Sequence, residues 1–91
     1  MEKKYIITYE LKNKTKDYST LYQAIKNLSK YWWHYIDSSW VVKHCELNSD
    51  EIFEKLRSHI DTQTDYILVI EINTENKQGW LPKKAWNWLK S

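Results

Sequence analysis

The alternation of apolar and polar residues predicts that the regular structure begins with a β-strand at 4–11. Every second side chain of this stretch is apolar, as expected for a strand with one buried face. A polar turn at 13–17 follows, and apolar residues then recur at helical spacing. This spacing predicts a first helix over about 18–30, with Asp17 among the residues available to cap it.

A β-hairpin is predicted next. Two aromatic and β-branched runs, at 32–36 and 40–45, flank a short polar break at 37–39. Asn48 then precedes Glu51 by three residues, which is the spacing of a capping box. A second helix should therefore begin after Asn48 and continue to about residue 59.

The strand predicted at 66–72 is the most apolar in the chain, and both of its faces are apolar. This pattern predicts a central strand that is covered on both sides. One face would meet the two helices. The other would be covered by a second subunit, by the C-terminal segment, or by both.

A final helix is predicted from Pro82 to about Lys90, after a break at 79–82. Trp86 and Trp88 lie about 200° apart around such a helix, so a single packing surface cannot bury both. We therefore expect one of them to face a partner. The candidate interface residues are the C-terminal tryptophans Trp80, Trp86 and Trp88.

The order strand, helix, strand, strand, helix, strand predicts an α+β fold, the ferredoxin-like β-α-β-β-α-β sandwich. A chain of 91 residues is expected to form one domain over 1–91, with the sandwich at 1–73 and an aromatic C-terminal extension at 74–91. The single cysteine excludes an internal disulfide and indicates a reduced, cytoplasmic protein. A thin core of this size favours a homodimer or higher homo-oligomer. No apolar run approaches the roughly 18 residues of a membrane span.

Charge and aromatic content point in different directions. Fourteen basic residues against twelve acidic ones give a net charge of +2, which is too balanced to predict nucleic-acid binding. The chain has six tryptophans and seven tyrosines but one phenylalanine. Because tryptophan and tyrosine carry a polar group on a large ring, this bias suggests interfaces or stacking sites.

Candidate ligand-binding residues come from the end of the first strand and from the hairpin. The hairpin combines aromatic rings, an imidazole and hydroxyl groups, which suits stacking on bases and hydrogen bonding to phosphate. In the other interpretation, the two hairpin tryptophans belong to the core and the serines form a turn. The candidate residues are Tyr9, Glu10, Lys12, Trp33, His34, Ser38, Ser39 and Trp40.

No cofactor is expected from sequence motifs. The histidines and the cysteine have no recognised zinc spacing, and there is no glycine-rich phosphate loop. A carboxylate at the end of the first strand, Glu10, could still meet its symmetry mate in a dimer and hold Mg²⁺ or Mn²⁺. A solvent-exposed glutamate with no metal role is the more ordinary interpretation.

Taken together, the segments 5–11 and 33–42, the Asp61 to Asp65 loop and the closing Trp88-Leu89 are similar to a known group. The chain resembles small ferredoxin-fold proteins related to the dimeric small subunit of the CRISPR adaptation complex and to virulence-associated protein D ribonucleases. The resemblance implies a homodimer and, in members with nuclease activity, an aspartate after the tyrosine that ends the first strand. Here that position is Glu10, and the longer side chain moves the carboxylate by about 1 Å, a displacement that can cost roughly a hundredfold in rate.

Three functions follow as hypotheses. The first is a non-enzymatic homo-oligomer that binds an oligonucleotide or a small signalling nucleotide, with sequestration in phage counter-defence as a special case. The second is a metal-dependent endonuclease with Glu10 paired across a dimer. The third is a protein-interaction module that uses the tryptophan-rich C-terminal helix.

Overall fold

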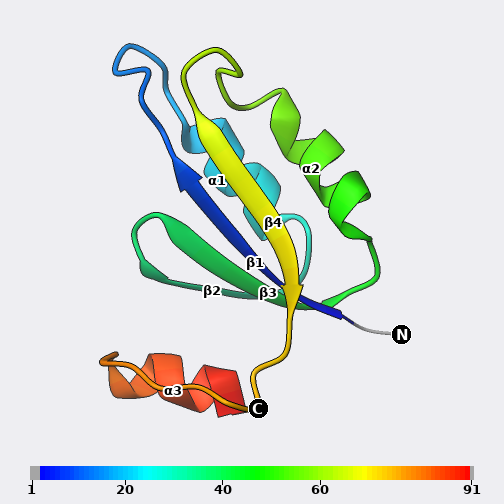
Figure 1. Cartoon of the computed structure of the whole chain (residues 1–91), viewed down its shortest axis with the longest axis vertical. Helices are drawn as coiled ribbons and strands as arrows, with labels where there is room; N and C mark the ends of the chain where they lie inside the picture. The colour runs from blue at the N-terminus through cyan, green and yellow to red at the C-terminus, as the bar shows by residue number, and fades with distance from the viewer. Residues whose placement is uncertain (1–2, 91) are drawn as a thin grey trace.

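The computed structural model describes residues 3–90. Four strands form one antiparallel sheet in the order β2-β3-β1-β4, and α1 and α2 lie on one side of it (Figure 1). This architecture fits the predicted ferredoxin-like α+β fold. In chain order the elements are β1 Lys3–Glu10, α1 Ser19–Lys26, β2 Tyr31–Ile36, β3 Ser39–Cys45, α2 Ser49–Arg57, β4 Tyr66–Ile72 and α3 Lys83–Lys90.

The strands lie close to their predicted positions, whereas two helices end earlier than predicted. The first helix was expected to reach residue 30, but α1 ends at Lys26. The chain is drawn toward β3 soon afterwards, because the Ser29 hydroxyl donates to the Lys43 carbonyl at 2.6 Å. The capping box of α2 is present, since Asn48 and Glu51 each accept a hydrogen bond from the backbone N–H of the other, at 2.9 and 3.0 Å.

The main core lies between the sheet and the helices α1 and α2. Trp40 is its largest fully buried side chain, and the indole N–H donates to the Tyr9 hydroxyl at 2.9 Å. Because this polar atom has a partner, the whole ring can be buried without leaving a donor unsatisfied. The buried members of this core are Tyr5, Ile7, Leu21, Ile25, Trp40, Val42, Cys45, Ile52, Leu56 and Ile60.

The opposite face of the sheet is covered in part by α3, which lies beside the β2–β3 hairpin and away from α1 and α2 (Figure 1). Trp33, Val41 and Ala85 are buried in this second cluster. Two hydrogen bonds hold the helix: the Trp33 indole donates to the Ala85 carbonyl at 3.2 Å, and the Lys43 ammonium donates to the Trp88 carbonyl at 3.1 Å. The C-terminal segment therefore covers one end of this face, as the sequence suggested.

Lys43 is unusual because it is a lysine whose side chain is buried in the sheet, with only 5% of the residue exposed. Burial lowers the pKa of its ammonium group, and the nearby Lys4 charge lowers it further. The ammonium also lies 4.2 Å from the centroid of the Trp88 ring. Its position at the carbonyl end of α3 is one that a helix dipole favours for a cation.

The prediction that 66–72 forms a central strand is wrong, because β4 lies at an edge of the sheet and β1 occupies a central position between β3 and β4. Ile67 and Val69 pack against the main core. On the other face Tyr66, Leu68 and Ile70 are exposed. Beyond the reach of α3, the apolar outer face of β4 is thus uncovered in the single subunit.

A bulge interrupts the pairing of β1 with β3. Lys3 pairs with Cys45 and Tyr5 pairs with Val42, so the β3 side has one extra residue. His44 lies within this bulge and has a φ of 57°, in the left-handed region where side chains other than glycine are disfavoured. Its backbone conformation is therefore better suited to glycine.

Two substitutions at position 44 should separate this backbone effect from the loss of the imidazole, whose ring lies 4.7 Å from the Tyr31 ring. Both His44→Gly and His44→Ala remove that contact. We expect the glycine variant to be the more stable by about 1 kcal/mol, because glycine adopts positive φ without a Cβ clash. Urea denaturation of the two variants measures the difference, and equal stabilities would contradict the assignment of strain.

Candidate functional site

The structure separates the predicted ligand-binding residues into two groups and leaves His34 and Ser39 outside both. Trp33 and Trp40 form the first group, and as exposed stacking residues they were predicted wrongly: their exposed fractions are 4% and 1%. They lie on opposite faces of the sheet, Trp40 in the main core and Trp33 beneath α3. The helices packed on each face of the sheet bury both rings, so neither can stack on a ligand in this conformation.

His34 and Ser39 support the hairpin. The His34 ring stacks on Trp40 with 3.7 Å between centroids, and its Nε2 lies 3.0 Å from the Asp37 carbonyl oxygen. The Ser39 hydroxyl lies 3.0 Å from the Thr8 hydroxyl on the neighbouring strand. These contacts give both residues an evident structural role.

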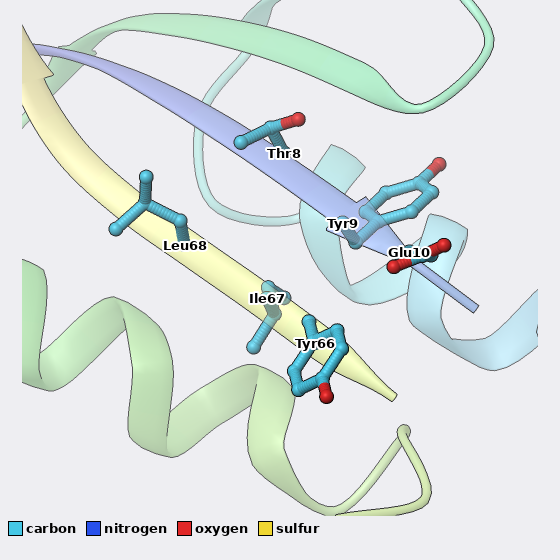
Figure 2. Close-up of a pocket in the computed structure, with 6 residues that line it drawn as sticks. All are labelled: Thr8, Tyr9, Glu10, Tyr66, Ile67 and Leu68. Atoms are coloured by element: carbon cyan, nitrogen blue, oxygen red, sulfur yellow. The ribbon is translucent and has the colours of Figure 1, made fainter. Parts of the chain in front are cut away.

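The second group comprises Tyr9, Glu10 and Ser38, which meet where β1 ends. Two adjoining grooves share Tyr9 and Glu10, and we call them the Tyr9–Glu10 grooves. The first, of about 280 Å³, is lined by Thr8, Tyr9, Glu10, Tyr66, Ile67 and Leu68. Figure 2 shows these six side chains on the neighbouring ends of β1 and β4. The second, of about 400 Å³, is lined by Tyr9, Glu10, Leu11, Tyr22, Asp37 and Ser38.

Lys12 joins this group through its ammonium, which lies 3.8 Å from the Glu10 carboxylate and 4.7 Å from the centroid of the Tyr66 ring. The Tyr66 ring itself is 66% exposed. An exposed aromatic ring beside a cation and a carboxylate can stack on a planar group and hydrogen-bond to its edge. Tyr66 was not among the predicted site residues, and its place in an apolar strand pattern gave no signal of this exposure.

The balance of charge favours the planar part of a ligand over its phosphates. Glu10 and Asp37 both line the grooves, whereas Lys12 is the nearby cation. The Tyr9 hydroxyl already donates to the Asp37 carbonyl at 3.1 Å and accepts from the Trp40 indole, and partial burial raises its pKa. These groups offer hydrogen-bond acceptors to amino or imino groups more readily than donors to an anion.

Asp65 fixes the loop that Lys12 comes from, a role that its place in the predicted Asp61 to Asp65 loop did not reveal. The Tyr18 hydroxyl donates to the buried carboxylate at 2.6 Å, and the backbone N–H groups of Lys12 and Asp61 each donate at 2.8 Å. Burial alone raises the pKa of Asp65, but these hydrogen bonds outweigh it and hold the pKa at about 2. Two loops distant in sequence are therefore joined through one charged group.

Carboxylate clustering does not single out a metal site. Among residues 3–90 there is no group of three or more histidine, cysteine, aspartate or glutamate side chains arranged to hold an ion. Glu10 is exposed, and its carboxylate lies 3.8 Å from the Lys12 ammonium. A cation at Glu10 would accordingly need carboxylates from another subunit.

The three C-terminal tryptophans differ in environment. Trp88 packs with the second cluster, and Trp86 is half-buried. Trp80 is completely exposed. Trp88 is also half-buried, so both rings of α3 are partly covered, and the most exposed ring precedes the helix.

Comparison with known proteins identifies the fold. No family model matches the chain, and no curated protein matches it in sequence. A crystal structure of a hypothetical protein, TT1823 from Thermus thermophilus, superposes with a TM-score of 0.65, covering 90% of this chain and 96% of that one. This chain and the Thermus thermophilus chain are 14% identical, so this similarity shows a shared fold alone.

Within the described residues, no helix is long and apolar enough to cross a membrane.

Proposed function

We propose that the protein is a non-enzymatic, self-associating binding protein that takes a nucleotide-type ligand into the Tyr9–Glu10 grooves. The observation that carries the proposal is the exposed Tyr66 ring beside the Lys12 ammonium and the Glu10 carboxylate. A base would stack on Tyr66, which every nucleobase can do through its π-face. Glu10, which lines both grooves, would meet polar groups on its edge.

Self-association is supported by the uncovered face of β4. Leu68 and Ile70 are 55% and 49% exposed, and Leu68 also lines the first groove. A second subunit covering these side chains would remove apolar surface from water, at roughly 25 cal/mol per Å². It would also enclose the groove beside them. The resemblance to dimeric ferredoxin-fold proteins agrees with this arrangement.

We expect Tyr66→Ala to weaken nucleotide binding by about 1 to 3 kcal/mol, the usual cost of losing one stacked base. Tyr35→Ala is a matched control, because Tyr35 is 44% exposed on β2 and lines neither groove. Native mass spectrometry, repeated after denaturation, reports the subunit number and any nucleotide retained. Thermal shift with a panel of mono-, di- and cyclic nucleotides then ranks the ligands. A protein that carries no nucleotide and shows no shift with any of them would contradict the proposal.

A metal-dependent nuclease is the second candidate, and it rests on the exposed position of Glu10 at the end of β1. Cleavage of RNA or DNA would have to require Mg²⁺ or Mn²⁺ and disappear in Glu10→Gln. Activity that survives this substitution would exclude Glu10 from the mechanism. The departure from aspartate at this position makes binding without cleavage the preferred hypothesis.

A further inference from the structure

A separate cavity of about 480 Å³ lies where the segment after β4 faces α3. Its volume is within the range of small-molecule sites, roughly 300 to 1,000 Å³. It shares no residue with the Tyr9–Glu10 grooves. Its lining residues are Glu75, Lys77, Gln78, Gly79, Trp86 and Lys90.

The walls of this cavity are anchored to the rest of the fold. Thr74 lies in the segment after β4 that forms one wall. Its hydroxyl accepts a hydrogen bond from the Lys4 ammonium of β1 at 3.0 Å, and its carbonyl accepts one from the Lys77 ammonium. On the other side, the Trp86 backbone N–H donates to Pro82 at 3.3 Å within a helix already held to the sheet. Groups held in place before binding lose little conformational freedom when a ligand arrives.

The chemistry of the lining suits an aromatic anion. Trp86 is half-buried and presents its indole to the cavity, and a Cβ built on Gly79 would lie 3.8 Å from its ring. The lining contains two basic residues, Lys77 and Lys90, and one acidic residue, Glu75. This excess of positive charge is the reverse of the charge at the Tyr9–Glu10 grooves, where carboxylates predominate.

We propose that this cavity binds a nucleotide unit of a single-stranded nucleic acid. The base would stack on Trp86, and the flanking phosphates would lie near Lys77 and Lys90. The completely exposed Trp80 follows Gly79 directly and provides a stacking surface for a neighbouring base. This site is independent of the ligand proposed for the Tyr9–Glu10 grooves.

Other partners fit the lining less well. The core of a protein–protein interface is depleted of lysine and glutamate, whereas three of the six residues here are charged. A membrane-binding helix must present its apolar side outward. In α3 that side, with Ala85 and Leu89, packs against the sheet. Nucleic acid is therefore the occupant that the charge and the aromatic ring favour.

The test uses the full chain and a fluorescein-labelled oligothymidylate of eight nucleotides, with binding followed by anisotropy at low and moderate salt. We expect Lys77→Glu combined with Lys90→Glu to weaken binding by about tenfold or more, because both phosphate contacts are lost. Lys83→Glu combined with Lys84→Glu is the matched control. This control changes the net charge by the same amount. Lys83 and Lys84 are exposed residues of α3, the helix that carries Lys90, but they do not line the cavity. The control variant should therefore weaken binding by less than about threefold.

Trp80→Ala provides a second variant, since the ring is fully exposed and its removal should leave the fold intact. We expect about a fivefold or greater loss of oligonucleotide affinity. Equal losses in the two lysine variants would show attraction by net charge alone and would overturn the proposal, as would a wild-type protein that does not bind the oligonucleotide. If Trp80→Ala lost self-association but kept oligonucleotide binding, the surface around Trp80 would be a protein contact surface, and the proposal would be overturned. Tyr66→Ala should leave oligonucleotide binding unchanged, so failure at one site is distinguishable from failure at the other.

Discussion

Trp40→Ala is expected to lower the free energy of unfolding by about 3 to 5 kcal/mol, the usual cost of truncating a large buried aromatic residue. Trp40 is 1% exposed and packs between the sheet and α1, where the ring also supports His34. The variant additionally deprives the Tyr9 hydroxyl of its indole donor. A domain of this size has only about 5 to 10 kcal/mol of stability in total. Urea denaturation followed by circular dichroism should therefore show a transition midpoint at a much lower urea concentration than that of the wild type.

Trp32→Ala is the matched control for this effect. Trp32 precedes Trp33 on β2, is 39% exposed, and its ring lies 5.0 Å from the Lys26 ammonium. Its removal should cost about 1 kcal/mol, because an exposed cation–π contact and partial burial are lost. If Trp40→Ala were as stable as Trp32→Ala but had lost nucleotide binding, Trp40 would be a ligand residue and its burial would have to be transient.

Asp65→Asn is expected to destabilise the fold by about 2 kcal/mol at pH 7. The carboxylate accepts from Tyr18 and from two backbone N–H groups, and these bonds to a charged acceptor are worth about 1.5 to 3 kcal/mol. An asparagine side chain would turn an NH₂ group toward at least one of these donors. The loops that carry Lys12 and Asp61 should then open more often, which hydrogen exchange can detect.

The effect of Asp65 should depend on pH in a defined direction. Its pKa in the folded protein is about 2, below the ordinary value of 3.8. The stabilisation is therefore complete above the unfolded-state pKa and is lost as the pH falls toward about 2. Unfolding curves of wild type and Asp65→Asn should accordingly converge in acid. The exposed Asp37→Asn serves as a control and should show little difference from wild type at pH 7.

Coupling with Tyr18 isolates the shortest of these hydrogen bonds. Burial raises the pKa of Tyr18, and the Asp65 carboxylate that accepts its hydrogen bond raises it further. In a double-mutant cycle, Tyr18→Phe and Asp65→Asn should be less than additive, since each removes the same contact. Strict additivity would show that the two side chains act independently and would contradict the geometry described here.

Local pattern predicted the elements because their signals are local. The alternation in β1, the Asn48 capping box and the turn at Asp37 all depend on residues within a few positions of one another. Strand order, in contrast, depends on residues that are far apart in the sequence. The strand β4 has two apolar faces, which is typical of a central strand, yet it pairs with β1 alone and leaves Leu68 exposed. Nothing in the strand itself encodes which neighbours it will have.

The candidate site was predicted in part for a related reason. Tyr9, Glu10 and Ser38, which were named as candidates separately, line one groove because one strand end and one hairpin turn are adjacent in the sheet. Whether a tryptophan faces in or out depends on what covers it, and Trp33 is buried by a helix more than fifty residues away. Lys43 and Asp65 likewise acquire their roles from distant partners.

The position of β1 has a consequence for how the chain folds. Strand β1 pairs with β3 on one side and with β4, about sixty residues later in the chain, on the other. Contacts between such distant segments must overcome the entropy of closing long loops, so folding is expected to be slow for a domain of this size. During translation one edge of β1 stays unpaired until β4, which ends at residue 72, has left the ribosome. A chain truncated before β4 would leave that edge exposed and prone to aggregation.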